Sequence, residues 1–283
     1  MEILSKDSEI KDSEIAELKF LMNKIYNEIG FDCRHYPVRF IQRRIMTRMM
    51  ACKVNSYLDY FNILNENKNE WKELVDALTI NVTQFFRDSS VWEALQNRVL
   101  PEIIQKKNNS DNKIIKIWSA GCSSGEEPYS ISILLKETLP DIFFYTIYAS
   151  DIDEDALIKA KEGIYNIRSL INIDRERFTK YFTRHDKDTY KISDEIKRKV
   201  IFLKHDIFEK TSFLLGLDII FCRNVMIYFT PEKKEEALEI FYNSLNDMGL
   251  LVLGKCEVIV TKKGVEMFSL YDLKEHIYVK KIN

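Results

Sequence analysis

The chain has 283 residues, of which 46% are hydrophobic and 30% are charged, and its formal net charge is −2. This composition is typical of an ordinary globular protein with one large domain or two unequal ones. No apolar run reaches the roughly 18 residues of a membrane span, and the first residues lack the pattern of a secretory signal. Five scattered cysteines without a Cys-x-x-Cys pair, and four histidines without metal-ligand spacing, predict reduced thiols and no metal site. We therefore expect a cytoplasmic protein without membrane insertion.

Residues 8 to 80 have the periodicity of helices. Apolar side chains recur at helical spacing from 14 to 29, and Gly30 is a natural stop. Pro37 opens a second helix, Ser56 caps a third that runs to 64, and residues 69 to 80 form a fourth. No strand pattern interrupts this section, which is too short to bury a large core alone. We expect a small helical domain over residues 1–82.

The second of these helices carries a basic stripe. Six basic residues and no acid lie between Arg34 and Lys53, and the apolar face of the helix leaves the arginines largely outside. On a nearly neutral protein, such a stripe predicts one acidic partner surface rather than general affinity for nucleic acid. A merely solvated helix face is the alternative.

After a helix around 90–107, the chain alternates strands and helices. Strands are expected at 114–118, 143–149, 200–203, 217–221 and 250–253, with helices at 128–138, 154–162 and 231–247. Thr230 caps the last helix, Pro231 occupies its first turn and Gly249 closes it. This alternation specifies a parallel sheet covered on both faces. Residues 189–192 form a short strand in a small β insertion at about 181–203, and residues 267–280 form a closing hairpin.

The most informative segment joins the first two strands of this sheet. The loop Gly-Cys-Ser-Ser-Gly at 121–125 leads into a helix that opens with Glu126 and Glu127, and the next strand ends on Asp151. A tight loop lets a ligand approach the backbone closely, and an acid at the end of the second strand can accept hydrogen bonds from a ribose. The pattern predicts a nucleoside site.

Two classes of nucleoside-binding protein fit this pattern. A dinucleotide dehydrogenase seats a pyrophosphate at the helix N-terminus, where Glu126 and Glu127 would repel it. A cationic ligand without phosphate fits the loop better, and S-adenosylmethionine is such a ligand. The residues alone favour this second class without excluding the first, and we expect Glu126 to be solvated.

Four blocks in a fixed order resemble the CheR family, the S-adenosylmethionine-dependent methyltransferases that esterify glutamates of bacterial chemotaxis receptors. They are Asn-Val-Thr-Gln-Phe-Phe-Arg at 81–87, Gly-Cys-Ser-Ser-Gly-Glu-Glu-Pro-Tyr-Ser at 121–130, Ala-Ser-Asp-Ile-Asp at 149–153, and Phe-Cys-Arg-Asn-Val-Met-Ile-Tyr-Phe at 221–229. The resemblance covers essentially the whole chain. It implies a class I (Rossmann-like) methyltransferase domain over 83–283, with a mostly parallel sheet and a small β-subdomain, after an all-helical domain that recognises the receptor.

The resemblance also implies roles for individual residues. Arg87 would pair with the methionyl carboxylate, Asp151 would accept from the ribose hydroxyls, and Asp206 with Ile207 would flank the adenine. The cofactor-binding residues implied are Asn81, Thr83, Arg87, Gly121, Glu127, Asp151, Asp206, Ile207, Arg223 and Asn224. Tyr228 would face the transferring methyl group, so Tyr228 and Arg223 are the expected catalytic residues, which orient the incoming carboxylate. The plainer alternatives are a surface cation for Arg87, a turn cap for Asp206 and a core residue for Tyr228.

The implied partners are methyl-accepting chemotaxis receptors in the membrane. Their glutamates have a reference pKa of about 4.3 and are already ionised at neutral pH, so no general base is needed. S-adenosylmethionine would leave as S-adenosylhomocysteine, and we expect the enzyme to be a monomer. The side chains expected to meet the acidic methylation helices of the receptor are those of the basic stripe, Arg39, Arg43, Arg44 and Arg48.

Two segments depart from the family pattern. Residues 254–257 are Gly-Lys-Cys-Glu, where the family usually has Gly-His-Ser-Glu, and the β insertion near 184–192 is short and has no glycine. Members that tether to a receptor's C-terminal pentapeptide carry a glycine there, so we expect no such binding. A methyltransferase for another carboxylate or another protein, and a sensor that holds the cofactor without turnover, are the alternatives from other classes.

Overall fold

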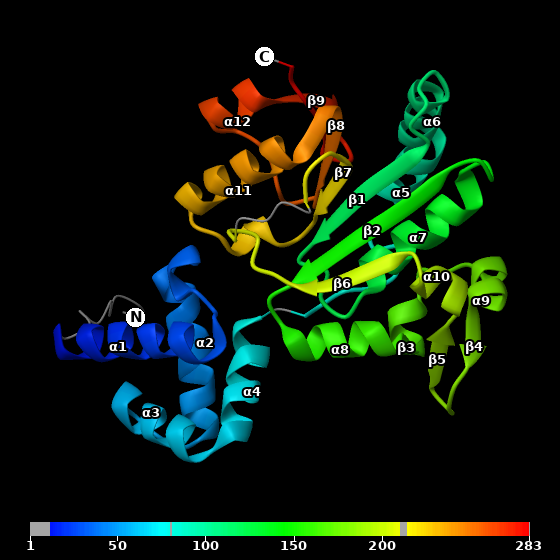
Figure 1. Cartoon of the computed structure of the whole chain (residues 1–283). Helices are drawn as coiled ribbons and strands as arrows, with labels where there is room; N and C mark the ends of the chain where they lie inside the picture. Colours follow the sequence, from blue (N-terminus) through cyan, green and yellow to red (C-terminus); the bar gives the residue numbers. More distant parts are fainter. Residues whose placement is uncertain (1–11, 80, 210–213, 283) are drawn as a thin grey trace, which may run out of the picture. The chain divides into compact units, whose positions relative to one another are not determined.

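The computed structural model describes residues 12–79, 81–209 and 214–282 (Figure 1). The chain divides into two compact units, residues 1–80 and 81–283. This division falls two residues before the expected boundary, so the whole 81–87 block belongs to the second unit. In the described parts of the chain, no helix is both long and apolar enough to cross a lipid bilayer.

Helices form the described part of the first unit, as the periodicity predicted. They are α1 Asp12–Ile29, the 3-10 turn η1 Cys33–His35, α2 Val38–Ala51, α3 Tyr57–Glu66 and α4 Lys68–Leu78. Ser56 caps α3, also as predicted, by accepting a hydrogen bond from the amide of Asp59 at 3.1 Å. Helix α1 packs against α3 and α2 against α4, and Leu21, Ile41 and Leu74 are fully buried. Residues 8–11 and Ile80, the expected ends of this section, lie outside the described residues.

The second unit is built on a sheet whose strand order is β6-β2-β1-β7-β8-β10-β9 within the described residues (Figure 1). The strands are β1 Ile114–Ala120, β2 Phe144–Asp151, β6 Val200–Lys204, β7 Leu217–Cys222, β8 Leu245–Leu253, β9 Phe268–Asp272 and β10 Ile277–Lys280. The pairs from β6 to β8 are parallel, whereas β10 runs antiparallel to both β8 and β9. The mostly parallel sheet and the closing hairpin confirm the predicted fold.

Helices cover both faces of this sheet. Ile117 on one face joins a buried cluster with Trp92 and Ile133 from the helices, whereas the Trp118 ring on the other face lies 5.5 Å from that of Phe241. Successive residues of a strand point to opposite faces of the sheet, so the neighbours Ile117 and Trp118 pack against different helices. The helices are α5 Ser89–Ala94, the π-helical η2 Leu95–Val99, α6 Leu100–Asn108, α7 Glu126–Thr138, α8 Glu154–Glu162, α11 Pro231–Ser244 and α12 Lys262–Met267, with the 3-10 turn η4 Met226–Tyr228.

A small antiparallel sheet forms the β insertion, but its bounds differ from the expected 181–203. Its strands are β3 Ile164–Asn166, β4 Phe182–Arg184 and β5 Thr189–Ile192, with η3 Ile167–Leu170, α9 Arg175–Tyr181 and α10 Asp194–Lys197 around them. The strand expected at 200–203 pairs with β2 in the large parallel sheet, as the alternation predicted, so the insertion ends before it. Residues 189–192 form the strand predicted for the insertion, whereas β3 and β4 were not predicted.

The prediction that Gly249 ends the helix after Pro231 is wrong. Helix α11 ends at Ser244, and Gly249 lies inside β8 without a positive φ. The left-handed residue at this bend is Met248, with φ +59°. The register of β8 against β7 shifts here, so β8 pairs first through Leu245 and again from Leu250. A bulge in a strand was therefore mistaken for the end of a helix.

Candidate functional site

The predicted site residues of the second unit gather at one edge of the large sheet. Gly121 follows β1, Asp151 ends β2 and Arg223 follows β7, and these three strands are parallel neighbours. In an open sheet of parallel strands, ligands bind outside the carboxyl ends of the strands. The loops after β1, β2 and β7 therefore form the candidate site.

The loop after β1 is held tightly against its neighbours. Gly121 has φ +74°, and a Cβ at this position would lie 2.5 Å from Cγ2 of Val225 in the loop after β7. The amides of Gly121 and Cys122 both donate to the carbonyl of Ser150, at 2.9 and 3.0 Å. Glycine is required here both for the left-handed backbone and for the close approach.

Asp151 lies between two loops and binds the backbone of each. Its Oδ2 accepts from the amide of Ser123 at 2.7 Å, and its Oδ1 accepts from the amide of Asp153 at 3.0 Å. Burial raises the pKa of Asp151 to about 6, although these hydrogen bonds act in the opposite direction. Each carboxylate oxygen has two lone pairs, so the ionised group can still accept from a ligand hydroxyl.

Asn81 ties the 81–87 block to both of these loops. Its Oδ1 accepts from the hydroxyl of Ser123 at 3.0 Å, and its Nδ2 donates to Oδ2 of Asp153 at 2.7 Å. Thr83 is half-buried, and Arg87 donates from Nη1 to the carbonyl of Val82 at 3.0 Å. Of the predicted residues in this block, Asn81 therefore contacts the loops after β1 and β2. The contribution of Ser123 and Asp153 was not predicted.

Arg223 is buried between two acids. Its side chain is 2% exposed, and its Nη2 lies 2.8 Å from Oδ2 of Asp88 while Nη1 lies 3.5 Å from Oε2 of Glu127. Glu127 also accepts from the hydroxyl of Ser119 at 2.8 Å. Burial raises the pKa of Glu127, and the charge of Arg223 opposes that shift. Because two carboxylates already neutralise the guanidinium, the geometry favours a role in positioning over a role in binding a third carboxylate.

Asp206 and Ile207 follow β6, beside Asp151. Asp206 Oδ1 accepts from the amide of Phe208 at 3.0 Å, which forms a turn, and Ile207 is buried. The amide of His205 donates to the carbonyl of Asp151 at 3.1 Å, so this loop is drawn toward the end of β2. This turn matches the plainer alternative for Asp206, that of a turn cap.

Asn224 and Tyr228 lie in the loop after β7. Asn224 has φ +61°, a left-handed conformation, and Tyr228 is half-buried at the end of η4. The backbone of this loop is bound by Glu257, from the loop after β8. The role of Glu257 was not predicted, because residues 254–257 depart from the family pattern and no role was assigned to that segment.

Glu126 is not solvated, contrary to the prediction. It is 3% exposed, and its Oε2 accepts from the hydroxyl of Ser124 at 2.7 Å. Burial raises the pKa of Glu126, and hydrogen bonds from Ser124 and Ser169 partly offset this effect. The first turn of α7 therefore carries one buried and one half-buried acid, which makes this loop unsuitable for a phosphate group.

The basic stripe of the first unit is only partly available to a partner. Arg39 and Arg43 are exposed, and Arg44 is half-buried, with its guanidinium 5.3 Å from the ring centre of Phe40. Arg48 instead lies 2.8 Å from Oε2 of the buried Glu70. Glu70 lies on the same helix face as Leu74, four residues later, and this spacing could have revealed it as an inward-facing acid.

The acid that binds Arg48 is the centre of a small polar cluster. Glu70 also accepts from the hydroxyl of Tyr60 at 2.8 Å. Burial would raise the pKa of Glu70, but the hydrogen bonds from Arg48 and Tyr60 outweigh it and lower that pKa below its usual value. Arg48 is thus an internal ion-pair partner and not an exposed part of the basic stripe.

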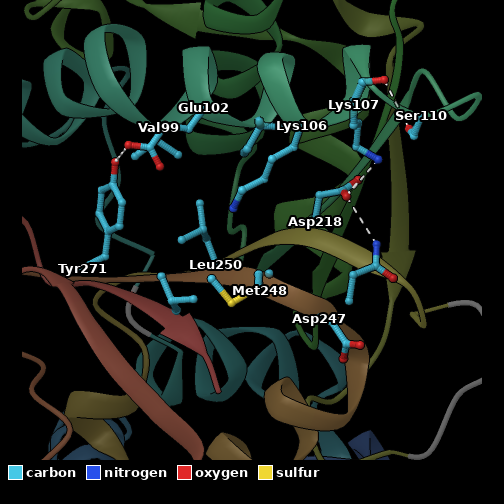
Figure 2. Close-up of a pocket in the computed structure, with 14 residues that line it drawn as sticks. Val99, Glu102, Lys106, Lys107, Ser110, Asp218, Asp247, Met248, Leu250 and Tyr271 are labelled. Carbon is cyan, nitrogen blue, oxygen red and sulfur yellow. Dashed lines mark hydrogen bonds and ion pairs between the residues drawn. The ribbon is translucent and has the colours of Figure 1, made fainter. Parts of the chain in front are cut away.

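A pocket of about 360 Å³ lies at the opposite edge of the sheet (Figure 2). Figure 2 shows Lys107 reaching from α6 to Asp218 near the start of β7, where the two groups are 3.0 Å apart. None of the predicted site residues lines this pocket. The candidate site therefore rests on the loops at the carboxyl ends of the strands and not on this pocket.

The two units of the chain match two domains of one protein family. The CheR methyltransferase SAM binding domain matches residues 81–275, and the CheR methyltransferase all-alpha domain matches residues 16–79. The chemotaxis protein methyltransferase of Borreliella burgdorferi is 34% identical over 256 residues, which cover 88% of this chain and 90% of that protein. Chemotaxis protein methyltransferase 2 of Vibrio cholerae is 35% identical over 238 residues, 82% of each chain. The match and the fold define a class I S-adenosylmethionine-dependent methyltransferase. The chain belongs to the CheR methyltransferase family.

The residues at the site fit the cofactor of this family. Asp151 keeps free lone pairs for ribose hydroxyls, and no side chain at Gly121 stands in the way of a nucleoside. The acids Glu126 and Glu127 lie where a cationic, phosphate-free ligand is favoured over a pyrophosphate. S-adenosylmethionine supplies the methyl group when it is bound.

Proposed function

We propose that this protein methylates glutamate side chains of membrane chemoreceptors and so forms glutamate methyl esters for sensory adaptation. The observation that carries the proposal is the match of both units to one family, together with relatives named chemotaxis protein methyltransferase over most of their length. The identity of the methyl acceptor has to be argued from the residues of this chain. The arguments are the position of the site residues and the charge of the basic stripe.

The cofactor contacts of this proposal follow the loops described above. Asp151 accepts hydrogen bonds from the ribose, and Asp206 with Ile207 flanks the adenine. Arg87 pairs with the methionyl carboxylate, because a guanidinium can bind a carboxylate through two parallel hydrogen bonds. The other residues proposed to contact the cofactor or shape its site are Asn81, Thr83, Gly121, Glu127, Arg223 and Asn224.

The chemistry makes small demands on the protein. The glutamate carboxylate is already ionised at neutral pH, so it attacks the methyl carbon without a general base. A new O–C bond forms as the S–C bond breaks, and the two opposite charges disappear in the products. Alignment of the three atoms in a site drier than water supplies the acceleration, and well-oriented pairs gain roughly 7–11 kcal/mol. Tyr228 orients the carboxylate, while Arg223 holds Asp88 and Glu127 in place.

Receptor docking is proposed to use the exposed part of the basic stripe. Arg39 and Arg43 are exposed on α2, and Arg44 is half-buried beside them. Acidic methylation helices match this charge. We further propose a cytoplasmic monomer that binds no receptor C-terminal pentapeptide, because the β4–β5 connection at 185–188 is short and has no glycine.

The test is a labelling reaction with chemoreceptor membranes and methyl-labelled S-adenosylmethionine. The proposal predicts label on the receptor that base releases as methanol, and no label on a receptor whose methylation-site glutamates are replaced by glutamine. Base-stable label would indicate methylation of nitrogen. Label on another protein would indicate a different acceptor, and cofactor binding without label would favour a sensor.

A further inference from the structure

Glu257 makes the densest set of backbone contacts at the candidate site. The residue is 4% exposed, and its Oε2 accepts from the amides of Asn224 and Gly254, both at 2.7 Å. Its Oε1 accepts from the amides of Val225 and Ile227, at 3.0 and 3.3 Å. One carboxylate therefore binds four backbone N–H groups, three of them in the loop after β7. Hydrogen bonds of this charge-assisted kind are stronger than those between neutral groups.

The sheet explains how residues so far apart in sequence meet. Strands β7 and β8 are parallel neighbours, and Cys222 at the end of β7 is paired with Leu253 at the end of β8. The two loops that follow leave the sheet side by side at the same edge. The loop after β7 carries Asn224 in a left-handed conformation, which asparagine tolerates better than most other non-glycine residues. Glu257 binds the amide of Asn224 and so helps to hold this conformation.

The turn that carries Glu257 is itself fixed from the other side. His276 Nδ1 lies 3.0 Å from the carbonyl of Gly254 and 2.7 Å from that of Glu257, and Lys255 pairs with the buried Glu275. Gly254 leaves no spare room. A Cβ there would lie 2.6 Å from Oε2 of Glu257 and 2.8 Å from the amide nitrogen of Asn224. The carboxylate is thus a rigid support for the neighbouring loop.

We propose that Glu257 is a positioning residue for methyl transfer. Its carboxylate fixes the backbone of residues 224–227 and thereby the place of Tyr228 relative to the transferred methyl group. In-line transfer depends on this placement, because a shift of about 1 Å in the reacting geometry can cost about 100-fold in rate. The catalytic part of the inference rests on the proposed role of Tyr228, whereas the backbone contacts do not.

The experiment compares Glu257→Gln with a matched control, Asp218→Asn. The glutamine keeps the shape of Glu257 but presents an NH₂ group to backbone N–H donors. Asp218 lies near the other end of β7, and its Oδ2 also accepts from a backbone amide, that of Lys116 at 2.9 Å. For each variant we would measure hydrogen exchange of residues 224–228, affinity for S-adenosylhomocysteine, and kcat per cofactor-binding site below the unfolding temperature.

Glu257→Gln should speed exchange in residues 224–228 and lower kcat about 10- to 100-fold, with a smaller loss of cofactor affinity. Asp218→Asn should leave these quantities at the wild-type level, and Glu257→Asp should restore part of kcat. If Glu257→Gln does not fold, Gly254→Ala disturbs the same contact and should give the same pattern. Unchanged exchange, or unchanged kcat per site, in the folded variant would overturn the proposal. Failure of the wild type and of Asp218→Asn to label receptor would instead refute the proposed function.

Discussion

The amide of Ser123 donates to Oδ2 of Asp151 at 2.7 Å, and this bond connects the loop after β1 with the end of β2. Ser123 has φ +46°, so the bond also supports a backbone conformation that serine rarely adopts. The same carboxylate is proposed to bind the ribose. The protonation state of Asp151 therefore affects both the loop and the cofactor.

Cofactor affinity should depend on pH through Asp151. The pKa of this group is raised to about 6, so at pH 5 only about one tenth of it is ionised. The ionised form is the one that can accept from the amides of Ser123 and Asp153 and also from the ribose. We expect the affinity for S-adenosylhomocysteine to fall about tenfold between pH 7 and pH 5 in calorimetric titrations. Asp151→Asn should bind weakly with little pH dependence. Equal pH profiles in the two proteins would contradict this role.

The same pKa predicts the sign of a stability effect. A carboxyl group whose pKa is higher in the folded state binds more protons when folded. The contribution of Asp151 to the unfolding free energy should therefore fall as the pH rises from about 4 to about 6, and it should stay low above that range.

Arg48 should contribute to stability rather than to receptor binding. Breaking its pair with the buried Glu70 leaves an acid without its main partner, at a cost of about 3 kcal/mol. We expect Arg48→Met to lower the unfolding free energy of the helical unit by this amount in urea titrations of the whole protein. Arg43→Met, on the same helix but exposed, should change it by no more than about 0.5 kcal/mol. Equal effects of the two substitutions would refute the distinction.

The sequence was most informative where local pattern decides the structure. The glycine loop at 121–125 and Asp151 could be predicted as site residues because the loop follows, and Asp151 ends, a strand with a clear apolar pattern. Contacts that depend on the order of strands or helices were missed. Glu257 meets Asn224 only because β8 lies next to β7, and Arg48 meets Glu70 only because α2 packs on α4. Such pairs are determined by tertiary packing, and a short segment of sequence does not show which strands or helices become neighbours.

Receptor methylation should depend on salt through Arg39 and Arg43. Charges on an exposed surface act over a Debye length of about 10 Å at 0.1 M salt. At subsaturating receptor, the wild-type rate should fall as salt is added. The double variant Arg39→Gln/Arg43→Gln should be slower at low salt and less sensitive to salt, with little change in kcat at saturating receptor. A wild-type rate that ignores salt would count against electrostatic docking.

Tyr228 should affect turnover and not cofactor binding. Removing only its hydroxyl, in Tyr228→Phe, removes the group proposed to orient the carboxylate. We expect kcat to fall at least about tenfold, since oriented groups supply much of the acceleration. The dissociation constant for S-adenosylhomocysteine should stay close to that of the wild type. Full turnover in this variant would show that the tyrosine only packs.

The most direct test of the account is a calorimetric titration of the whole protein with S-adenosylhomocysteine, made at two temperatures so that a small heat at one is not mistaken for no binding. The wild type should bind one S-adenosylhomocysteine per chain. Gly121→Ala should bind it much more weakly, because the added Cβ would lie 2.5 Å from Cγ2 of Val225. No binding by the wild type, or undiminished binding by the variant, would contradict a cofactor site formed by the loops after β1, β2 and β7.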